Sequence, residues 1–176
     1  MAQTLKPALR DAILDAARDA FAVDGWSSAS LADIARRAGV STGNVYRYFA
    51  NRDALYAEAI PDAVAEELLR RVERRVSSLA RTAELTQPDP QAVQDAEEML
   101  AYLLAHRREA ITLLSATTGP HAAFPRRFAG LLEGPILAAA NPTDPVVTLL
   151  VGVVVANTVH ALAAILRASP PWITTT

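Results

Sequence analysis

The chain contains no cysteine among its 176 residues. This absence excludes disulfide bonds, thiolate metal sites and thiol nucleophiles, and it fits the reducing cytoplasm. Aromatic residues make up only 6% of the sequence, so a ligand pocket that relied on them would be modest. The sequence also has no glycine-rich phosphate loop and no nucleophile motif. We therefore expect neither an enzyme nor a protein with a bound cofactor.

Histidine is equally scarce, with His106, His121 and His160 as the only three. Their separations do not match any spacing of metal ligands, so no metal site is predicted. The N-terminus has several charged residues and no unbroken apolar core, which is unlike a signal peptide. The sequence thus predicts a cytoplasmic protein.

Positive and negative charges nearly balance, which leaves a net charge of −2. The basic residues are not evenly distributed: residues 1–56 hold seven basic and six acidic side chains, whereas residues 57–176 hold ten and thirteen. A small basic excess confined to one end is expected of a protein that contacts nucleic acid through a single face.

Apolar residues near the N-terminus recur at three- and four-residue steps, which predicts an amphipathic helix. The helix begins near Pro7, where a missing N–H costs little, and ends at Asp24-Gly25. A second face carries Asp11, Asp15 and Asp19, which the pattern favours as a solvated surface over a metal site.

Two short helices follow in quick succession. Ser30 and Asp33 have the spacing of a capping box, and Gly39 ends that helix after two turns. Ser41 caps a third helix over residues 42–49, and Asn51 caps a fourth that opens at Arg52. Two short helices joined by a turn with one glycine, and braced by a first helix, are the layout of a helix-turn-helix.

The stretch LADIARRAGVSTGNVYRYFANRDAL, from Leu31 to Leu55, resembles the TetR family of bacterial transcriptional regulators. Its most specific part is AGVSTGNVYRYF, which ends at Phe49. Two positions depart from the family: Tyr48 stands where histidine is usual, and Arg52 where lysine is usual. The resemblance implies an all-α protein, with a helix-turn-helix DNA-binding domain over residues 1–56 and a helical effector-binding and dimerisation domain over residues 57–176.

The third helix has the residue types that a major-groove helix requires. Small residues at its start let the backbone approach phosphates, while Asn44 and Arg47 can hydrogen-bond base edges. Tyr46 can contact phosphate or thymine, and Tyr48 is open between a DNA contact and a place in the core. By resemblance, Arg52 is a phosphate anchor. The expected DNA-contacting set is Ser30, Ser41, Thr42, Gly43, Asn44, Tyr46, Arg47, Tyr48 and Arg52.

Helical patterns continue to the C-terminus. Pro61 either kinks one long helix or separates two, and helices are expected over residues 91–106, 108–118 and 121–140. We expect the last of these to be interrupted at Pro125 and at Gly134-Pro135. Sharp turns are predicted at residues 87–90 and 141–145. We interpret one basic run as a solvated helix face whose charges are paired with nearby acidic residues. The run consists of Arg70, Arg71, Arg74 and Arg75.

Residues 146–166 form a segment without Lys, Arg, Asp or Glu, long enough to span a bilayer. It contains Asn157 and His160, however, and lacks a flanking basic cluster or aromatic belt. A helix that is apolar on nearly all sides also suits a dimer interface. In TetR-like proteins the last two long helices form a four-helix bundle, so we favour a homodimer through residues 121–140 and 146–167 over a membrane span.

The resemblance therefore implies a regulator, most often a repressor, that binds a palindromic double-stranded DNA operator and responds to a small molecule. The alternative is a helix-turn-helix protein without an effector that acts through a protein partner. Candidate ligand-contacting residues in the C-terminal domain combine polar groups with apolar surface. They are Met99, Tyr102, His106, Thr112, Thr117, His121 and Phe124.

Overall fold

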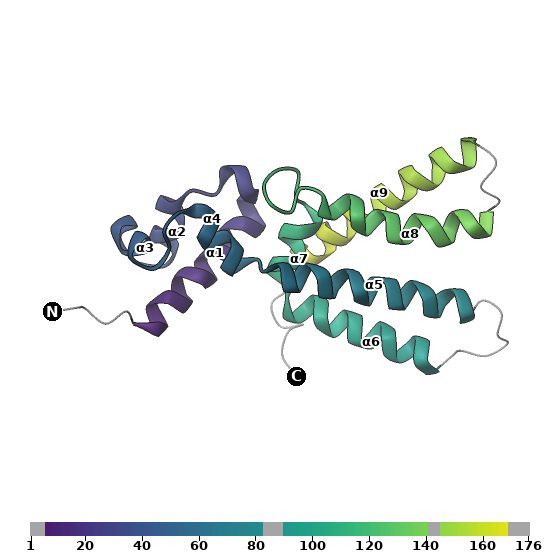
Figure 1. Cartoon of the computed structure of the whole chain (residues 1–176), viewed down its shortest axis with the longest axis horizontal. Coiled ribbons are helices and arrows are strands. Elements are labelled where there is room, and N and C mark those ends of the chain that lie inside the picture. The colour runs from purple at the N-terminus through teal and green to yellow at the C-terminus, as the bar shows by residue number, and fades with distance from the viewer. Residues whose placement is uncertain (1–5, 83–89, 141–144, 169–176) are drawn as a thin grey trace.

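The computed structural model describes residues 6–82, 90–140 and 145–168, and helices are the regular secondary structure of this part of the chain. The predicted all-α fold is confirmed. The helices form two groups that follow one another along the long axis of the molecule (Figure 1). We call the first group the head and the second the body.

The head consists of four helices, α1 to α4: Pro7–Ser28, Leu31–Arg37, Thr42–Tyr48 and Arg52–Ala59. Its caps are the predicted ones. Ser30, Ser41 and Asn51 each accept a hydrogen bond from the backbone N–H three residues later, at 3.1, 3.2 and 2.8 Å. Gly25 and Gly39 have φ of 74° and 68°, values that favour glycine, at the bend of α1 and in the turn after α2.

The head is held together by side chains from all four helices. Phe21 of α1, Ile34 of α2, Val45 of α3 and Leu55 of α4 are buried, and Phe49 closes the core after α3. Burial of this apolar surface fixes the angle between α2 and α3, because the two helices are too short to be stable alone.

The body consists of five helices, α5 to α9: Asp62–Thr82, Pro90–Ala105, Arg107–Leu114, Phe124–Ala140 and Pro145–Ala168. α5 pairs with α6 and α8 with α9, and both pairs extend away from the head, with α7 between them and the head (Figure 1). Pro61 separates α4 from α5, which settles the two alternatives that the sequence left open.

Several of the expected boundaries in the body were wrong. α7 ends at Leu114 rather than near Thr118. α8 begins at Phe124 rather than at residue 121, and it is interrupted neither at Pro125, which lies in its first turn, nor at Gly134-Pro135. Pro135 has no backbone N–H, so α8 lacks the one hydrogen bond that this residue would donate to the Leu131 carbonyl, yet the helix continues to Ala140. Most of the turns predicted at residues 87–90 and 141–145 lies outside the described residues.

The basic run on α5 has the acidic partners that were expected of a solvated face, although they come from two helices. Arg70 and Arg71 contact Glu67 at 2.5 and 2.6 Å, and Arg71 and Arg74 contact Glu98 of α6 at 3.7 and 3.4 Å. These pairs compensate the positive charge on α5 and connect it to α6. A second DNA-binding surface is not indicated there.

Candidate nucleic-acid interface

Helix α3 lies at the end of the head that is farthest from the body (Figure 1). Val45 is buried on its inner side, while Gly43, Tyr46 and Arg47 are exposed on its outer side. Tyr46 is 55% exposed, a large value for an aromatic side chain. The outer face of α3 therefore presents polar and aromatic side chains to whatever the head docks on.

Gly43 lies on this exposed face of α3. A Cβ atom at Gly43 would meet only the Ser41 hydroxyl, at 3.9 Å, so no contact within the protein requires glycine here. Glycine inside a helix costs about 1 kcal/mol relative to alanine. Gly43 thus leaves the backbone of α3 open on its exposed side.

Tyr48 points inward and back along the chain. Its ring packs against the core, and its hydroxyl accepts a hydrogen bond from the Lys6 backbone N–H at 3.0 Å. The hydroxyl thus holds the residue that precedes α1. The structure therefore gives Tyr48 a structural position, which was one of the two roles left open by the sequence.

Arg52 is half-buried at the start of α4. Its guanidinium carbon lies 4.1 Å from the centroid of the Trp26 ring, and its Nη1 donates to the Ala29 carbonyl at 3.5 Å. Trp26 packs in turn against Tyr56, with ring centroids 4.8 Å apart in an edge arrangement. Sequence analysis missed Trp26, which the structure shows to be the surface on which Arg52 rests.

Ser30 and its neighbours form a small hydrogen-bonded group at the start of α2. The Ser30 hydroxyl lies 3.0 Å from Asp33 Oδ2, and Arg36 lies 3.3 Å from Oδ1. The hydroxyl of Ser30 and then the guanidinium of Arg36 hold the pKa of the Asp33 carboxyl below its usual range. Arg37 pairs with Asp24 at 2.8 Å, so it stabilises the α1–α2 contact.

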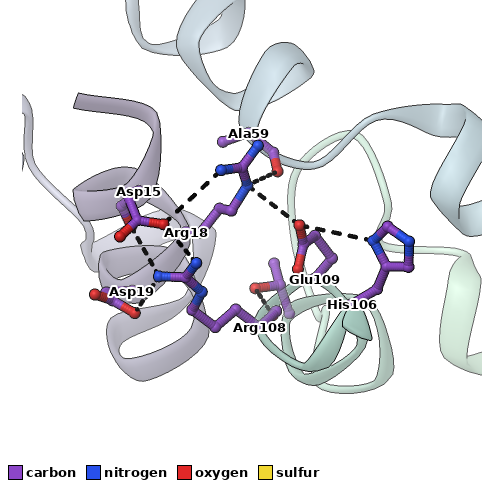
Figure 2. Close-up of polar contacts among 8 residues, drawn as sticks. Asp15, Arg18, Asp19, Ala59, His106, Arg108 and Glu109 are labelled. Atoms are coloured by element: carbon purple, nitrogen blue, oxygen red, sulfur yellow. Dashed lines mark hydrogen bonds and ion pairs between the residues drawn. The ribbon is translucent and has the colours of Figure 1, made fainter. Parts of the chain in front are cut away.

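The head and the body are joined by ion pairs between α1 and α7. Arg108 Nη2 lies 2.5 Å from Asp15 and its Nη1 lies 3.1 Å from Asp19, as Figure 2 shows. The hydrogen bond from Arg108 lowers the pKa of the Asp15 carboxyl. Asp15 and Asp19 remain exposed, as expected of a solvated face, and the fold in addition brings an arginine from the body onto them.

Arg18 makes the second connection across the same boundary. Its Nε lies 3.2 Å from Glu109 of α7 and 3.2 Å from the carbonyl of Ala59, the last residue of α4 (Figure 2). Only 11% of the Glu109 side chain is exposed, so this contact is more shielded from water than those of Arg108. Arg18 thus fixes the end of the head helix α4 to both α1 and α7.

The residues expected to contact a ligand lie at separate places in the body. Tyr102 and His106 pack ring to ring at 4.4 Å, and Met99 lies beside the core. His121 Nδ1 lies 3.1 Å from the hydroxyl of Tyr56, whose pKa burial raises to about 12. Phe124 is buried against Phe128, and Thr112 and Thr117 line a cavity near the head, described below.

Residues 13–59 match the protein family described as bacterial regulatory proteins, tetR family. The head of this chain is a TetR-family domain. Its match begins in α1 and ends with the last residue of α4, so it includes the whole helix-turn-helix and leaves out the body.

Curated relatives of the TetR-family head are transcriptional regulators by name. The chain is 36% identical over 70 residues to the HTH-type transcriptional regulator AlkX of Mycobacterium tuberculosis, covering 38% of this chain and 33% of that protein. It is 37% identical over 62 residues to BetI of Klebsiella pneumoniae, covering 35% and 32%. The chain thus matches about a third of the length of each relative.

The solved structures that this chain resembles in fold include two regulators. One is the fatty acid degradation regulator FadR of Bacillus halodurans, at 20% identity, with 94% of this chain and 93% of that chain covered and a TM-score of 0.42. The other is the TetR family regulator PfmR of Thermus thermophilus, at 18% identity, with 90% and 86% covered and a TM-score of 0.42.

Proposed function

We propose that this protein is a TetR-type transcriptional repressor that binds a palindromic operator as a homodimer. The observation that carries the proposal is the outer face of α3, where Gly43 leaves the backbone open to approach and Tyr46 and Arg47 are exposed. The match of residues 13–59 to the TetR family supports the same reading.

The proposed contacts divide into two kinds. Ser30, Ser41, Thr42, Gly43 and Tyr46 hold the DNA backbone through hydroxyls and N–H groups, together with Arg52. Asn44 and Arg47 read base edges, asparagine on adenine and arginine on guanine. Tyr48 supports the recognition helix from inside the head, since its hydroxyl is bonded to Lys6.

The proposed dimer forms through the outer faces of α8 and α9. Burial on α9 is confined to one stripe, and the large apolar side chains opposite it are exposed. They are Val146, Leu149, Leu150, Val153, Val154 and Ile165, with Ile136 on α8. A large exposed apolar patch on a folded protein marks an interaction surface.

Helix α9 is also long and apolar enough to cross a bilayer by length and composition. We favour the dimer because α9 packs along α8 and α7, and because its C-terminal end is bonded into the fold. Arg107 of α7 donates from Nε to the Leu166 carbonyl at 2.5 Å. A cytoplasmic dimer also places both heads where DNA is.

In this proposal residues 1–56 bind DNA, and residues 57–176 dimerise and sense a small molecule. The boundary falls within α4, whose last residue, Ala59, ends the head. The alternative, a regulator without an effector that acts through a protein partner, has the same head. Ion pairs of Arg108 and Arg18 give the body a direct connection to α1 in either case.

The test is selection of bound fragments from the genome of the source organism, followed by footprinting of the enriched sites. The proposal expects a short palindrome whose half-site centres are about 34 Å apart, one turn of DNA. Recovery of fragments without a shared sequence from a purified dimer at moderate salt would reject it. Recovery of isolated half-sites would reject the dimeric mode.

A further inference from the structure

A cavity of about 220 Å³ lies where the head meets the body. Its walls come from four parts of the chain: the end of α1, Tyr56 of α4, the end of α7 with the residues that follow, and the end of α9. The residues that matter for its chemistry are Trp26, Tyr56, Thr112, Ser115, Thr117 and Arg167. The proposed function gives the body a small-molecule sensing role without a site, and the inference below rests on that proposal and assigns the role to this cavity.

The lining of the cavity includes a cationic group. Arg167 lines the cavity, and its Nη2 donates to the Ser115 hydroxyl at 2.6 Å. Within the described part of the chain, Arg167 forms no ion pair with a carboxylate. Asp24 also lines the cavity, but its carboxylate is paired with Arg37 at 2.8 Å. The cavity therefore offers a guanidinium and neighbouring hydroxyls to an anion.

The lining also includes two aromatic side chains that are closely packed. Trp26 and Tyr56 meet edge to face, and both line the cavity. Gly119 has φ of 82°, and a Cβ atom there would overlap the Trp26 indole, so the segment after α7 rests directly on the ring. The aromatic wall is therefore fixed from both sides.

We propose that this cavity binds a small carboxylate with an apolar body. Arg167 and Ser115 hold the carboxylate, and the apolar part lies against Trp26. A cavity of about 150 Å³ is enough for benzene in another protein, so the larger volume here accommodates a ring or short chain with a carboxyl group. A charge-assisted hydrogen bond from guanidinium to carboxylate is about twice as strong as a neutral one.

Occupation of the cavity acts on the head through Trp26. The guanidinium of Arg52 lies over the same indole, so a ligand that shifts the ring also shifts Arg52. This consequence for DNA rests on the proposed function, in which Arg52 holds the DNA backbone. Binding of the carboxylate itself does not depend on DNA.

The experiment uses the full chain with Trp172→Phe, which leaves Trp26 as the only tryptophan, and follows its fluorescence. The probes are benzoate and hexanoate, with benzamide as the uncharged counterpart of benzoate. We expect a saturable change with benzoate or hexanoate at a Kd of about 1 mM or tighter, and a response to benzamide at least about tenfold weaker. No saturable change with either carboxylate overturns the site.

Variants separate the cavity from general salt effects. Arg167→Gln and Ser115→Ala are expected to weaken carboxylate binding about tenfold or more and about threefold, respectively, with an unchanged helical circular dichroism spectrum. Arg126→Gln removes an exposed arginine of α8 outside the cavity and is expected to change nothing. Equal binding by Arg167→Gln and the parent overturns the proposal. Because fluorescence needs no operator, a failure of DNA binding leaves this result interpretable.

Discussion

The guanidinium of Arg52 lies over the indole of Trp26, 4.1 Å from the ring centroid. The contact joins the first residue of α4 to the bend of α1, and Trp26 also touches Tyr56 and the segment around Gly119. Arg52 is thus positioned by residues that lie outside the helix-turn-helix itself. These contacts connect Arg52, a proposed DNA contact, to the segment of the body around Gly119.

Trp26→Leu is expected to weaken operator binding in the same way as Arg52→Ala. The first change removes the ring that positions the Arg52 guanidinium, and the second removes the guanidinium itself. Loss of the cation–π contact and of ring packing should also lower the free energy of unfolding by about 2 kcal/mol. Anisotropy and chemical denaturation measure the two effects. If Trp26→Leu lost stability but bound operator like the parent, Arg52 would not depend on the ring.

Gly43→Ala is expected to change stability and DNA affinity in opposite directions. The added methyl meets only Ser41 at 3.9 Å, so the helix should gain about 0.5–1 kcal/mol of stability from alanine. The same methyl faces the DNA backbone and should weaken operator binding about tenfold. Gly39→Ala, at φ of 68°, is the contrasting control and should destabilise the fold. Unchanged affinity in Gly43→Ala would remove the argument for close approach.

Arg47→Ala and Arg52→Ala are expected to change DNA binding in different ways. Loss of a base contact by Arg47 should reduce discrimination at one or two base pairs by about 1–3 kcal/mol, whereas loss of a phosphate contact by Arg52 should weaken binding to all sequences alike. Binding to a set of single-base operator variants measures this. The same pattern in both variants would show that the assigned roles are wrong.

Asp15 is expected to make acid stability depend on the contact between α1 and α7. The hydrogen bond from Arg108 lowers the pKa of the Asp15 carboxyl in the folded protein. Its contribution is therefore complete above the unfolded value, about 4, and is lost as the pH falls through the lower folded value. Asp15→Asn should flatten the pH dependence of unfolding in that acidic range. Asp11→Asn, at an exposed residue of the same helix, should leave it as in the parent.

The exposed apolar face of α9 predicts the effect of charge on assembly. Leu149→Glu with Val153→Glu, at side chains 69% and 50% exposed, should convert the dimer to a monomer without loss of helix. Leu100→Glu on α6 is the matched control, since that leucine is 56% exposed on another helix. Light scattering after gel filtration decides between them. A dimer that survives the double change would place the interface elsewhere.

Local structure in the head could be predicted because its signals lie close together in the sequence. Ser30, Ser41 and Asn51 cap helices within three residues, and Gly39 turns the chain at one position. Contacts between distant residues could not be predicted. Asp15 and Arg108 are 93 residues apart, and nothing in the α1 pattern distinguishes a carboxylate that meets an arginine from one that meets water.

The effect of proline in the body also could not be predicted from local sequence. Pro61 and Pro135 carry the same local signal, yet the first separates two helices and the second lies within α8. The outcome depends on what surrounds the freed carbonyl and on packing along the rest of the helix. α8 packs along α5 and α9, and it continues through Gly134 and Pro135.

The most direct test of the account is an anisotropy titration that compares one selected palindrome with a DNA of equal length in which one half-site is scrambled. Two recognition helices, each with few contacts, predict tight binding to the palindrome at moderate salt and binding to the single half-site at least about a hundredfold weaker. Equal affinity for the palindrome and a fully scrambled duplex would contradict the claim that α3 reads DNA as part of a dimer.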